Sequence, residues 1–214
     1  SMPFLEAARQ LHREVGAEEN CIFVHTTLVP VVGAVGEQKT KPTQHSVKEL
    51  RSIGIQPDVI VGRGAAPLDY EIKRKISLFC DVSLGAVVSA PDAKSIYQVP
   101  LVLEEQGLTD YLLKKLNLES KKKDLDFWSK YVNEIIAPRD EVEIAIIGKY
   151  THLKDSYISY VEALHHCTAE TGIKTNIRWI EAEDIEKEGT KYLEALHGII
   201  VPGGFGERGI EGKI

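Results

Sequence analysis

Short apolar runs alternate with amphipathic stretches along the first half of the chain. Three mainly apolar runs have the length and composition of strands buried in a parallel sheet. They are residues 21–24, 58–61 and 86–89. Four stretches around them have helical patterns, namely residues 3–15, 43–54, 69–79 and 98–117. The alternation of strand and helix predicts an α/β fold in which helices wrap a parallel sheet.

The same alternation restarts near residue 140 and predicts a second α/β domain. Its expected elements are strands at 142–148, 176–180 and 198–201 and a helix at 154–171. The stretch between the two patterns contains a charged break at 120–124 and a helix around Phe127 and Trp128. We therefore predict one domain at 1–117, a linker at 118–139 and a second domain at 140–214.

Both predicted domains look like parts of larger ones. About 75 residues after the linker are few for a doubly wound domain, and the last strand leads directly into the glycine-rich residues 202–206. The first domain begins with a helix that no strand precedes. A parallel sheet lacking half its strands would expose unpaired edges. We therefore expect two partial three-layer domains that belong to a longer protein.

Composition narrows the class of protein. Hydrophobic residues make up 43% and charged residues 27% of the 214 positions, as in an ordinary globular protein. No apolar run approaches the roughly 20 residues of a membrane span, so no membrane partner is expected. The net charge of −6 argues against a nucleic-acid-binding surface. Three cysteines without pairing or metal spacing predict free thiols in a reducing, cytoplasmic setting.

The segment from Lys39 to Gln44, between a predicted strand and a predicted helix, is the strongest candidate for chemistry. It places two ammonium groups and two hydroxyls at a helix N-terminus, where free N–H groups favour an anion. Ligands of open α/β sheets bind in such loops, and a polyphosphate fits this one. Pro42 favours an extended Lys41. A solvated loop in which Thr43 caps the helix is the alternative.

Three other candidates each have a plain structural alternative. Lys75 lies in a basic stretch of a predicted helix, which is equally typical of a solvated face. Asp92 follows a strand, where it suits either a nucleoside contact or a simple turn with a helix cap. The glycines of 202–206 would let backbone N–H groups approach a ligand closely, as an oxyanion hole requires, but a glycine-rich turn alone is weak evidence.

Several catalytic signatures do not occur in the sequence. It has no G-x-x-x-x-G-K-[ST] phosphate loop. Cys167 lies in the middle of a predicted helix, where a nucleophile on a strand-to-helix elbow would not lie. His165 and His166 have no partner at metal spacing. His25 and His45 are isolated and favour structural, hydrogen-bonded roles.

The string from Lys39 to Asp58, which begins Lys-Thr-Lys-Pro-Thr-Gln, closely resembles the CTP synthase family. Four further strings resemble it in the same order along the chain. They are residues 1–7, 95–97, 148–150 and 202–206. The resemblance implies a P-loop/Rossmann-like amidoligase half followed by a flavodoxin-like half of a class I glutamine amidotransferase.

The resemblance also implies roles for particular residues. Those matching the site for UTP, and for CTP as inhibitor, are Lys39, Thr40, Lys41, Pro42, Thr43, Gln44 and Lys75. Those matching the ATP-contacting segment are Pro91, Asp92 and Ala93, with contacts expected through the backbone. Gly204 matches a glutamine-binding position, and Gly203 and Gly204 are the candidates for the oxyanion hole.

The implied reaction is the ATP-dependent amination of UTP to CTP in pyrimidine biosynthesis. ATP phosphorylates O4 of the uracil, and ammonia from L-glutamine displaces the phosphate. The resemblance further implies feedback inhibition by CTP, activation by GTP, Mg²⁺ with ATP, no organic cofactor and a homotetrameric complete enzyme. The phosphate loop and magnesium ligands are expected before Ser1, and the cysteine nucleophile with its His and Glu partners after Ile214.

This piece alone is therefore expected to be inactive. Two alternatives remain open. One is a non-catalytic module of the same fold that senses UTP or CTP or forms filaments. The other is a different class I amidotransferase, which would leave the Lys39–Gln44 segment unexplained.

Overall fold

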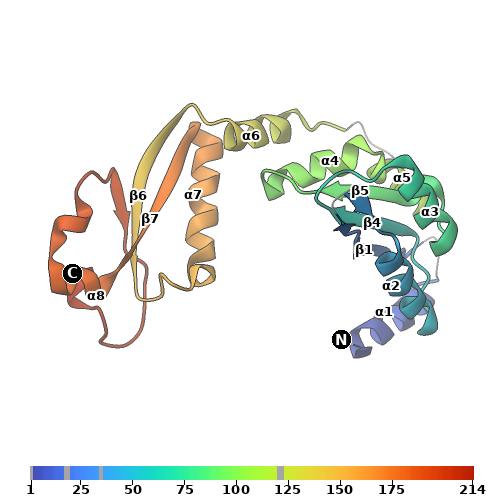
Figure 1. Cartoon of the computed structure of the whole chain (residues 1–214), viewed down its shortest axis with the longest axis horizontal. Helices are drawn as coiled ribbons and strands as arrows, with labels where there is room; N and C mark the ends of the chain where they lie inside the picture. Colours follow the sequence, from blue (N-terminus) through green and yellow to red (C-terminus); the bar gives the residue numbers. More distant parts are fainter. Residues whose placement is uncertain (1, 17–19, 34–35, 120–122) are drawn as a thin grey trace. The chain divides into compact units, whose positions relative to one another are not determined.

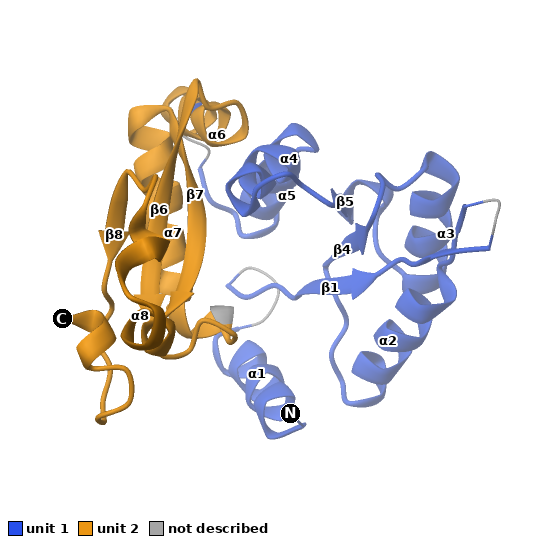
Figure 2. Cartoon of the chain, turned by 60° about the vertical axis from the view of Figure 1, so that its left-hand side comes forward, with its two compact units in different colours: residues 1–125 blue, residues 126–214 orange. Residues whose placement is uncertain are grey.

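The computed structural model describes residues 2–16, 20–33, 36–119 and 123–214. Part of the predicted charged break at 120–124 lies outside these residues. The chain divides into two compact units, residues 1–125 and 126–214, which Figure 2 distinguishes by colour. The division falls inside the stretch predicted as a linker. Each unit is built around its own parallel sheet.

The first unit contains a three-stranded parallel sheet in the order β1-β4-β5. His25 pairs with Ile60 and Val61 with Val88, which fixes the register of the sheet. A small antiparallel hairpin, β2–β3, follows β1. The elements are α1 (Met2–Glu14), β1 (Val24–Leu28), β2 (Val31–Val32), β3 (Glu37–Gln38), α2 (Lys41–Ser52), β4 (Val59–Gly64), α3 (Tyr70–Cys80), β5 (Val87–Pro91), α4 (Val99–Glu105) and α5 (Leu108–Lys115).

Helices cover both faces of this sheet, as predicted (Figure 1). On one face, buried residues of the sheet pack against α2 and α3 in a cluster that includes Val47, Ile60 and Ile76. On the other face, Val61 and Val88 belong to a cluster completed by α4 and α5. The alternation of side chains along each strand supplies the two faces. The prediction of an α/β fold with helices around a parallel sheet is confirmed for this unit.

Two predicted elements of the first unit differ most from the structure in their bounds. The first strand begins at Val24, where the predicted strand ended, because residues 24–28 pair with β4. The preceding Phe23 instead exchanges hydrogen bonds with Asp58. The helix predicted at 98–117 is divided into α4 and α5 by Gly107, whose φ of +75° is in the left-handed region that favours glycine.

The second unit has the parallel order β7-β6-β8. Its elements are α6 (Asp126–Ile136), β6 (Asp140–Gly148), η4 (Lys154–Tyr157), α7 (Ile158–Thr171), β7 (Ile173–Glu181), α8 (Ala182–Glu188), η5 (Thr190–Leu193), β8 (Gly198–Ile200) and η6 (Glu211–Lys213). Ala145 and Ile147 pack with Ile180 and the residues of α8 and η5. The predicted helix at 154–171 is a 3₁₀ turn followed by α7.

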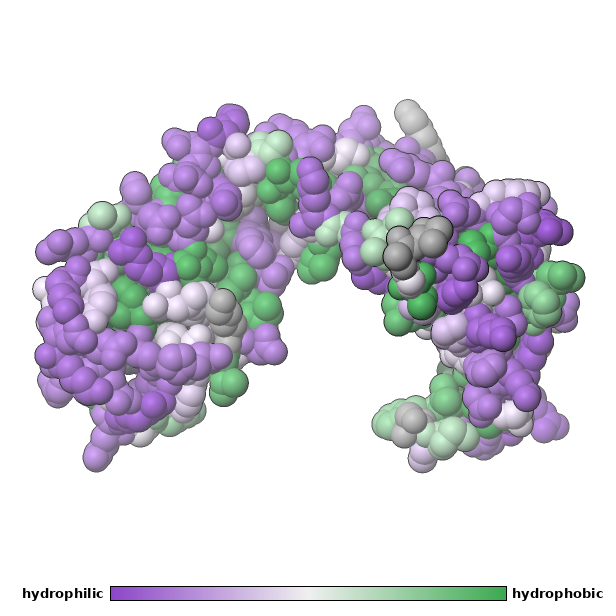
Figure 3. All heavy atoms as spheres, viewed as in Figure 1, coloured by the Kyte–Doolittle hydropathy of each residue, from purple (hydrophilic) through white to green (hydrophobic). Residues whose placement is uncertain are grey.

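Hydrophilic residues cover much of the visible surface of both units (Figure 3). Hydrophobic residues gather at the free end of α1, where Met2 and Phe4 are exposed. None of the helices in the described ranges is long and apolar enough to cross a membrane. The three cysteines are free thiols, with Cys80 buried in the first unit and Cys167 exposed on α7.

Candidate functional site

The hairpin β2–β3 leads the chain into the Lys39–Gln44 segment and fixes where that segment starts. The N–H of Lys39 donates to the carbonyl of Pro30 at 2.9 Å. The buried amide of Gln38 donates to the carbonyl of Pro67 at 2.8 Å and accepts from the N–H of Asp69 at 3.3 Å. The segment is therefore tied to the loop that follows β4.

The start of α2 differs from the prediction in two respects. The helix begins at Lys41, so Lys41 is helical and not extended. Pro42 lies in the first turn, where its missing N–H leaves no hydrogen bond unmade. The N-cap residue is Thr40, whose side chain makes no capping hydrogen bond. The alternative in which Thr43 caps the helix is therefore wrong in its choice of cap residue.

The hydroxyls of this segment form hydrogen bonds to neighbouring groups of the protein. Thr43 is fully buried, and its Oγ1 donates to the carbonyl of Leu28 at 3.4 Å. The same Oγ1 accepts from Thr27 at 3.4 Å. Thr40 is also buried, and its Oγ1 accepts from the side chain of Gln44 at 3.0 Å. These bonds hold the first turn of α2 against the carboxyl end of β1.

Lys39 and Lys75 lie near the same carboxylate although they come from different segments. The ammonium of Lys39 contacts Oε2 of Glu37 at 2.5 Å. This hydrogen bond and the charge of Lys39 lower the pKa of Glu37, and the charge of Lys75 lowers it further. Lys75 is exposed on α3, as is Lys41 at the start of α2. The charge of Lys75 therefore acts on the same carboxylate that the ammonium of Lys39 contacts.

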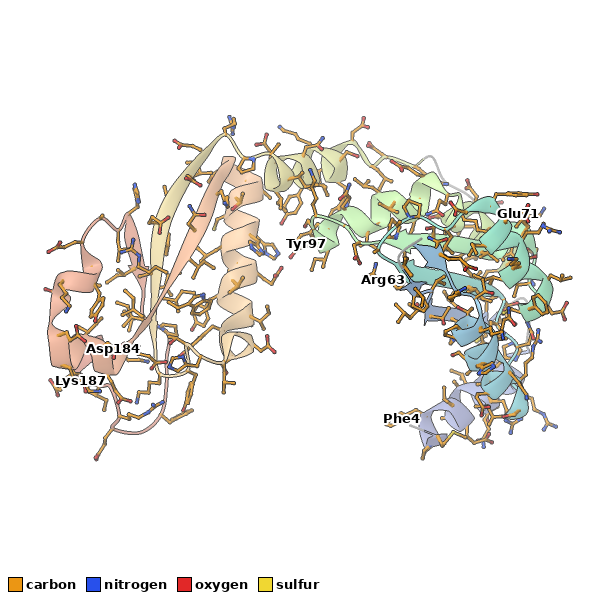
Figure 4. The ribbon with its side chains drawn as sticks, viewed as in Figure 1. Phe4, Arg63, Glu71, Tyr97, Asp184 and Lys187 are labelled. Carbon is orange, nitrogen blue, oxygen red and sulfur yellow. The ribbon has the colours of Figure 1, made fainter. Side chains whose placement is uncertain are left out.

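The ends of β4 and β5 are joined by an arginine that the sequence analysis missed. Arg63, labelled in Figure 4, donates to the carbonyl of Ala90 at 2.6 Å and to Oδ1 of Asp92 at 2.7 Å. The N–H of Asp92 donates to the carbonyl of Gly64 at 3.0 Å. In the sequence, the signal for Arg63 was a charged residue that interrupts the apolar run of β4. The helix cap near Asp92 is Ser95, which accepts from the N–H of Tyr97.

All these candidates except Lys75 therefore follow the carboxyl ends of strands in one sheet. β1, β4 and β5 are parallel and end at Leu28, Gly64 and Pro91. Lys39–Gln44 follows β1 through the hairpin, and Asp92 follows β5 directly. This edge is where open α/β sheets bind ligands. It can offer the ammonium groups of Lys39 and Lys41 and the residues that follow β5.

In the second unit, residues 202–206 follow β8 and are here called the glycine loop. Two lysines donate hydrogen bonds to carbonyls of this loop. The ammonium of Lys149 donates to the carbonyls of Phe205 and Gly206, at 3.2 and 2.5 Å. The ammonium of Lys213 donates to the carbonyl of Pro202 at 2.7 Å. A Cβ at Gly204 would lie 3.4 Å from Nζ of Lys213. Both candidate glycines, Gly203 and Gly204, are exposed.

Lys149 is itself held firmly at the end of β6. Its N–H donates to the hydroxyl of Tyr157 at 2.9 Å, and its carbonyl accepts from Arg208 at 2.5 Å. Tyr157 is buried and lies so close that a Cβ at Gly148 would be 2.3 Å from the hydroxyl. Gly148 therefore permits this close contact. In the sequence, Lys149 stood out only as part of residues 148–150, one of the strings that carry the family resemblance.

Other titratable groups have local roles. Nε2 of His25 lies 2.9 Å from Oγ of Ser46, and partial burial lowers the pKa of His25. The prediction of a structural, hydrogen-bonded His25 is confirmed. Within the described residues, no three His, Cys, Asp or Glu side chains form a group that could hold a metal ion.

Two family models match the chain. The model described as CTP synthase N-terminus matches residues 1–118, and the model described as Glutamine amidotransferase class-I matches residues 152–214. The first match lies within the first compact unit and the second match within the second. The order of the two matches agrees with the order of the two parallel sheets.

The chain is also similar to curated proteins along its whole length. It is 60% identical over 214 residues to the CTP synthase of Pyrococcus abyssi and 52% identical over 221 residues to that of Methanocaldococcus jannaschii. It is 52% identical over 215 residues to the CTP synthase of Gloeothece citriformis. These alignments include 100% of the chain and 40%, 41% and 38% of the respective relatives. The chain thus spans about 40% of the length of these relatives.

The family model described as CTP synthase N-terminus matches residues 1–118 of 214, which is more than half of the chain. It includes β1, β4 and β5 and every residue predicted to contact a nucleotide. The second model includes the glycine loop. On these grounds, the chain belongs to the CTP synthase family.

Proposed function

We propose that the protein to which this chain belongs converts UTP to CTP, using ATP and ammonia released from L-glutamine. The names of its relatives and the two family matches support this reaction. In this proposal the first unit is part of a P-loop/Rossmann-like amidoligase domain at 1–117. The second is part of a flavodoxin-like amidotransferase domain at 140–214.

The observation that carries the proposal is the placement of Lys39 and the start of α2 after the carboxyl end of β1, with Lys75 on α3 acting on the same carboxylate as Lys39. A triphosphate needs several charge-assisted donors close together. Lys39 and Lys75 both act on Glu37, so their charges lie near each other, and Lys41 is exposed at the N-terminus of the same helix. We assign Lys39–Gln44 and Lys75 to UTP, and to CTP as inhibitor.

We assign ATP to the neighbouring segment that contains Pro91, Asp92 and Ala93. Arg63 already binds the carboxylate of Asp92, so this side chain is neutralised on one side. The N–H of Asp92 is used by Gly64. The segment would therefore contact a base through its remaining backbone groups. The proposal assigns no Mg²⁺ ligand to this chain, and Mg²⁺ would accompany ATP.

In the second unit we assign glutamine binding to Gly204 and the oxyanion hole to Gly203 and Gly204. Backbone N–H groups that face an acyl intermediate stabilise its oxyanion. No nucleophile is assigned here, since Cys167 is exposed on α7 and lies on no strand-to-helix elbow. The proposal also includes activation by GTP and a homotetrameric complete enzyme.

The test is CTP formation by the purified complete protein with UTP, ATP and either glutamine or ammonia. We expect turnover with both nitrogen sources and none when UTP or ATP is omitted. We expect the 214-residue chain alone to form no CTP, because the proposal gives it neither a nucleophile nor a metal ligand. Binding of UTP and CTP by the complete protein without turnover would favour a nucleotide-sensing module instead.

A further inference from the structure

The carbonyl and N–H groups of the glycine loop have opposite surroundings. The carbonyls of Pro202, Phe205 and Gly206 all accept hydrogen bonds from ammonium groups. In contrast, the N–H groups of residues 203–206 donate to no acceptor among the residues that the structure describes. The residues are exposed. A loop in which three carbonyls are occupied and the N–H groups are free is suited to bind an anion.

The geometry of the peptide bond connects these two facts. In a trans peptide, the carbonyl of one residue and the N–H of the next point in opposite directions. The described chain contains no cis peptide. The bond from Lys213 to the carbonyl of Pro202 therefore turns the N–H of Gly203 away from Lys213. The bonds from Lys149 orient the peptides that follow Phe205 and Gly206 in the same way.

The two lysines bind carbonyl groups of the loop, and Lys149 is buried. Lys149 is 5% exposed, and neither Lys149 nor Lys213 forms an ion pair with a carboxylate in the described residues. Burial and the nearby charge of Lys149 lower the pKa of Lys213. An ammonium buried without a carboxylate is costly unless hydrogen bonds compensate it. Here the compensating acceptors are the carbonyls of the glycine loop.

We propose that Lys149 and Lys213 are positioning residues that hold the glycine loop by its carbonyls, so that its N–H groups face glutamine. The inference rests on the proposed function. Lys213 orients the N–H of Gly203 at the start of the loop, and Lys149 fixes its far end.

The test uses the complete protein with Lys149→Met and Lys213→Met, which keep an unbranched side chain but remove the donors. Lys187→Met serves as the matched control, because Lys187 is an exposed lysine on α8 of the same unit (Figure 4). For each protein, kcat and KM for glutamine hydrolysis are compared with the rate of CTP formation from added ammonia. Lys149→Arg and Lys213→Arg restore donors and charge.

We expect each Met variant to lower kcat for glutamine hydrolysis about 10- to 100-fold, somewhat less than the loss of a whole oxyanion donor. KM for glutamine and ammonia-dependent synthesis should change less than about threefold, within the context-dependence of such effects. The Arg variants should recover part of kcat. Since Lys149 is almost fully buried, Lys213→Met is the decisive variant if Lys149→Met does not fold.

Two results would overturn the inference while the proposed function stands. One is a glutamine kcat in Lys213→Met equal to that of Lys187→Met. The other is an equal loss of glutamine- and ammonia-dependent synthesis, which would give Lys213 a general structural role. Absence of CTP formation by the wild-type protein with both nitrogen sources would instead overturn the proposed function and the inference with it.

Discussion

Single side chains at the edge of the first sheet have two kinds of role. Thr40 and Thr43 are buried and bind neighbouring groups of the protein. Lys41 and Lys75 are exposed, and the ammonium of Lys39 contacts the exposed Glu37. A surface pair such as Lys39–Glu37 contributes little to stability. The lysines are therefore available to a ligand, and the threonines hold the backbone that presents them.

This difference leads to a prediction for Lys39→Ala and Lys41→Ala in the complete protein. Each change should remove a charge-assisted contact worth about 1.5–3 kcal/mol, which is about ten- to a hundredfold in affinity. UTP and CTP carry the same triphosphate, so the half-saturation for UTP and the inhibition constant for CTP should rise together. Lys48→Ala, an exposed lysine further along α2, is the control. Unchanged constants in both variants would leave the segment as a solvated helix start.

His25 gives a prediction for pH dependence. Partial burial lowers its pKa from the ordinary value of 6.5, so the folded chain disfavours the charged ring. Below pH 6.5 the unfolded chain binds this proton before the folded chain does. The free energy of unfolding should therefore fall as the pH falls through 6.5 towards the lowered pKa.

The measurement is urea unfolding followed by far-UV circular dichroism at pH 7.5 and pH 5.5, in the wild-type chain and in His25→Gln. Glutamine can still bond to Ser46 but does not titrate, so the variant should lose less stability on acidification. An identical loss in both proteins would show that His25 does not contribute.

At the scale of elements, periodicity located most helices and strands but not their ends. Nothing local in residues 21–28 shows that the strand starts at Val24, because that start depends on pairing with β4, far along the sequence. The helix predicted across 98–117 contained its own break in Gly107.

Likewise, the sequence indicated an anion site at Lys39–Gln44. Arg63, Lys149 and Lys213 were missed because their partners are distant carbonyls and carboxylates.

The break between α4 and α5 brings Gln106 to the edge strand β5. Its Oε1 accepts from the N–H of Ser89 at 2.8 Å, and its Nε2 donates to the carbonyl of Ser89 at 2.7 Å. The side-chain amide of Gln106 thus pairs with the backbone of Ser89 as one residue of a neighbouring strand would. It covers two backbone groups that an edge strand would leave unpaired.

We predict that Gln106→Ala lowers the free energy of unfolding by about 1–3 kcal/mol, because it leaves both groups of Ser89 without this partner. Urea unfolding followed by circular dichroism measures the change. Glu105→Ala, at the exposed neighbouring position, is the control and should stay within about 0.5 kcal/mol of wild type. If the two variants are equally stable, the contact contributes nothing to the edge of the sheet.

At the scale of the whole chain, each unit has a hydrophobic core of its own. The buried clusters on the two faces of the first sheet contain residues of the first unit only. The cluster around Ala145 and Ile147 belongs entirely to the second. A domain with its own core can unfold by itself. The sequence predicted two domains, and the division at 125/126 lies within the predicted linker.

Both tryptophans of the chain, Trp128 and Trp179, lie in the second unit. Tryptophan fluorescence therefore follows the unfolding of that unit, whereas far-UV circular dichroism follows both. Ile60→Ala removes a fully buried side chain from the first unit and should cost about 2–5 kcal/mol. We predict that it moves a part of the circular dichroism transition to lower urea and leaves the fluorescence transition in place. Ile147→Ala, the matched change in β6, should move the fluorescence transition, and a common shift of both signals by either variant would show that the two units unfold as one.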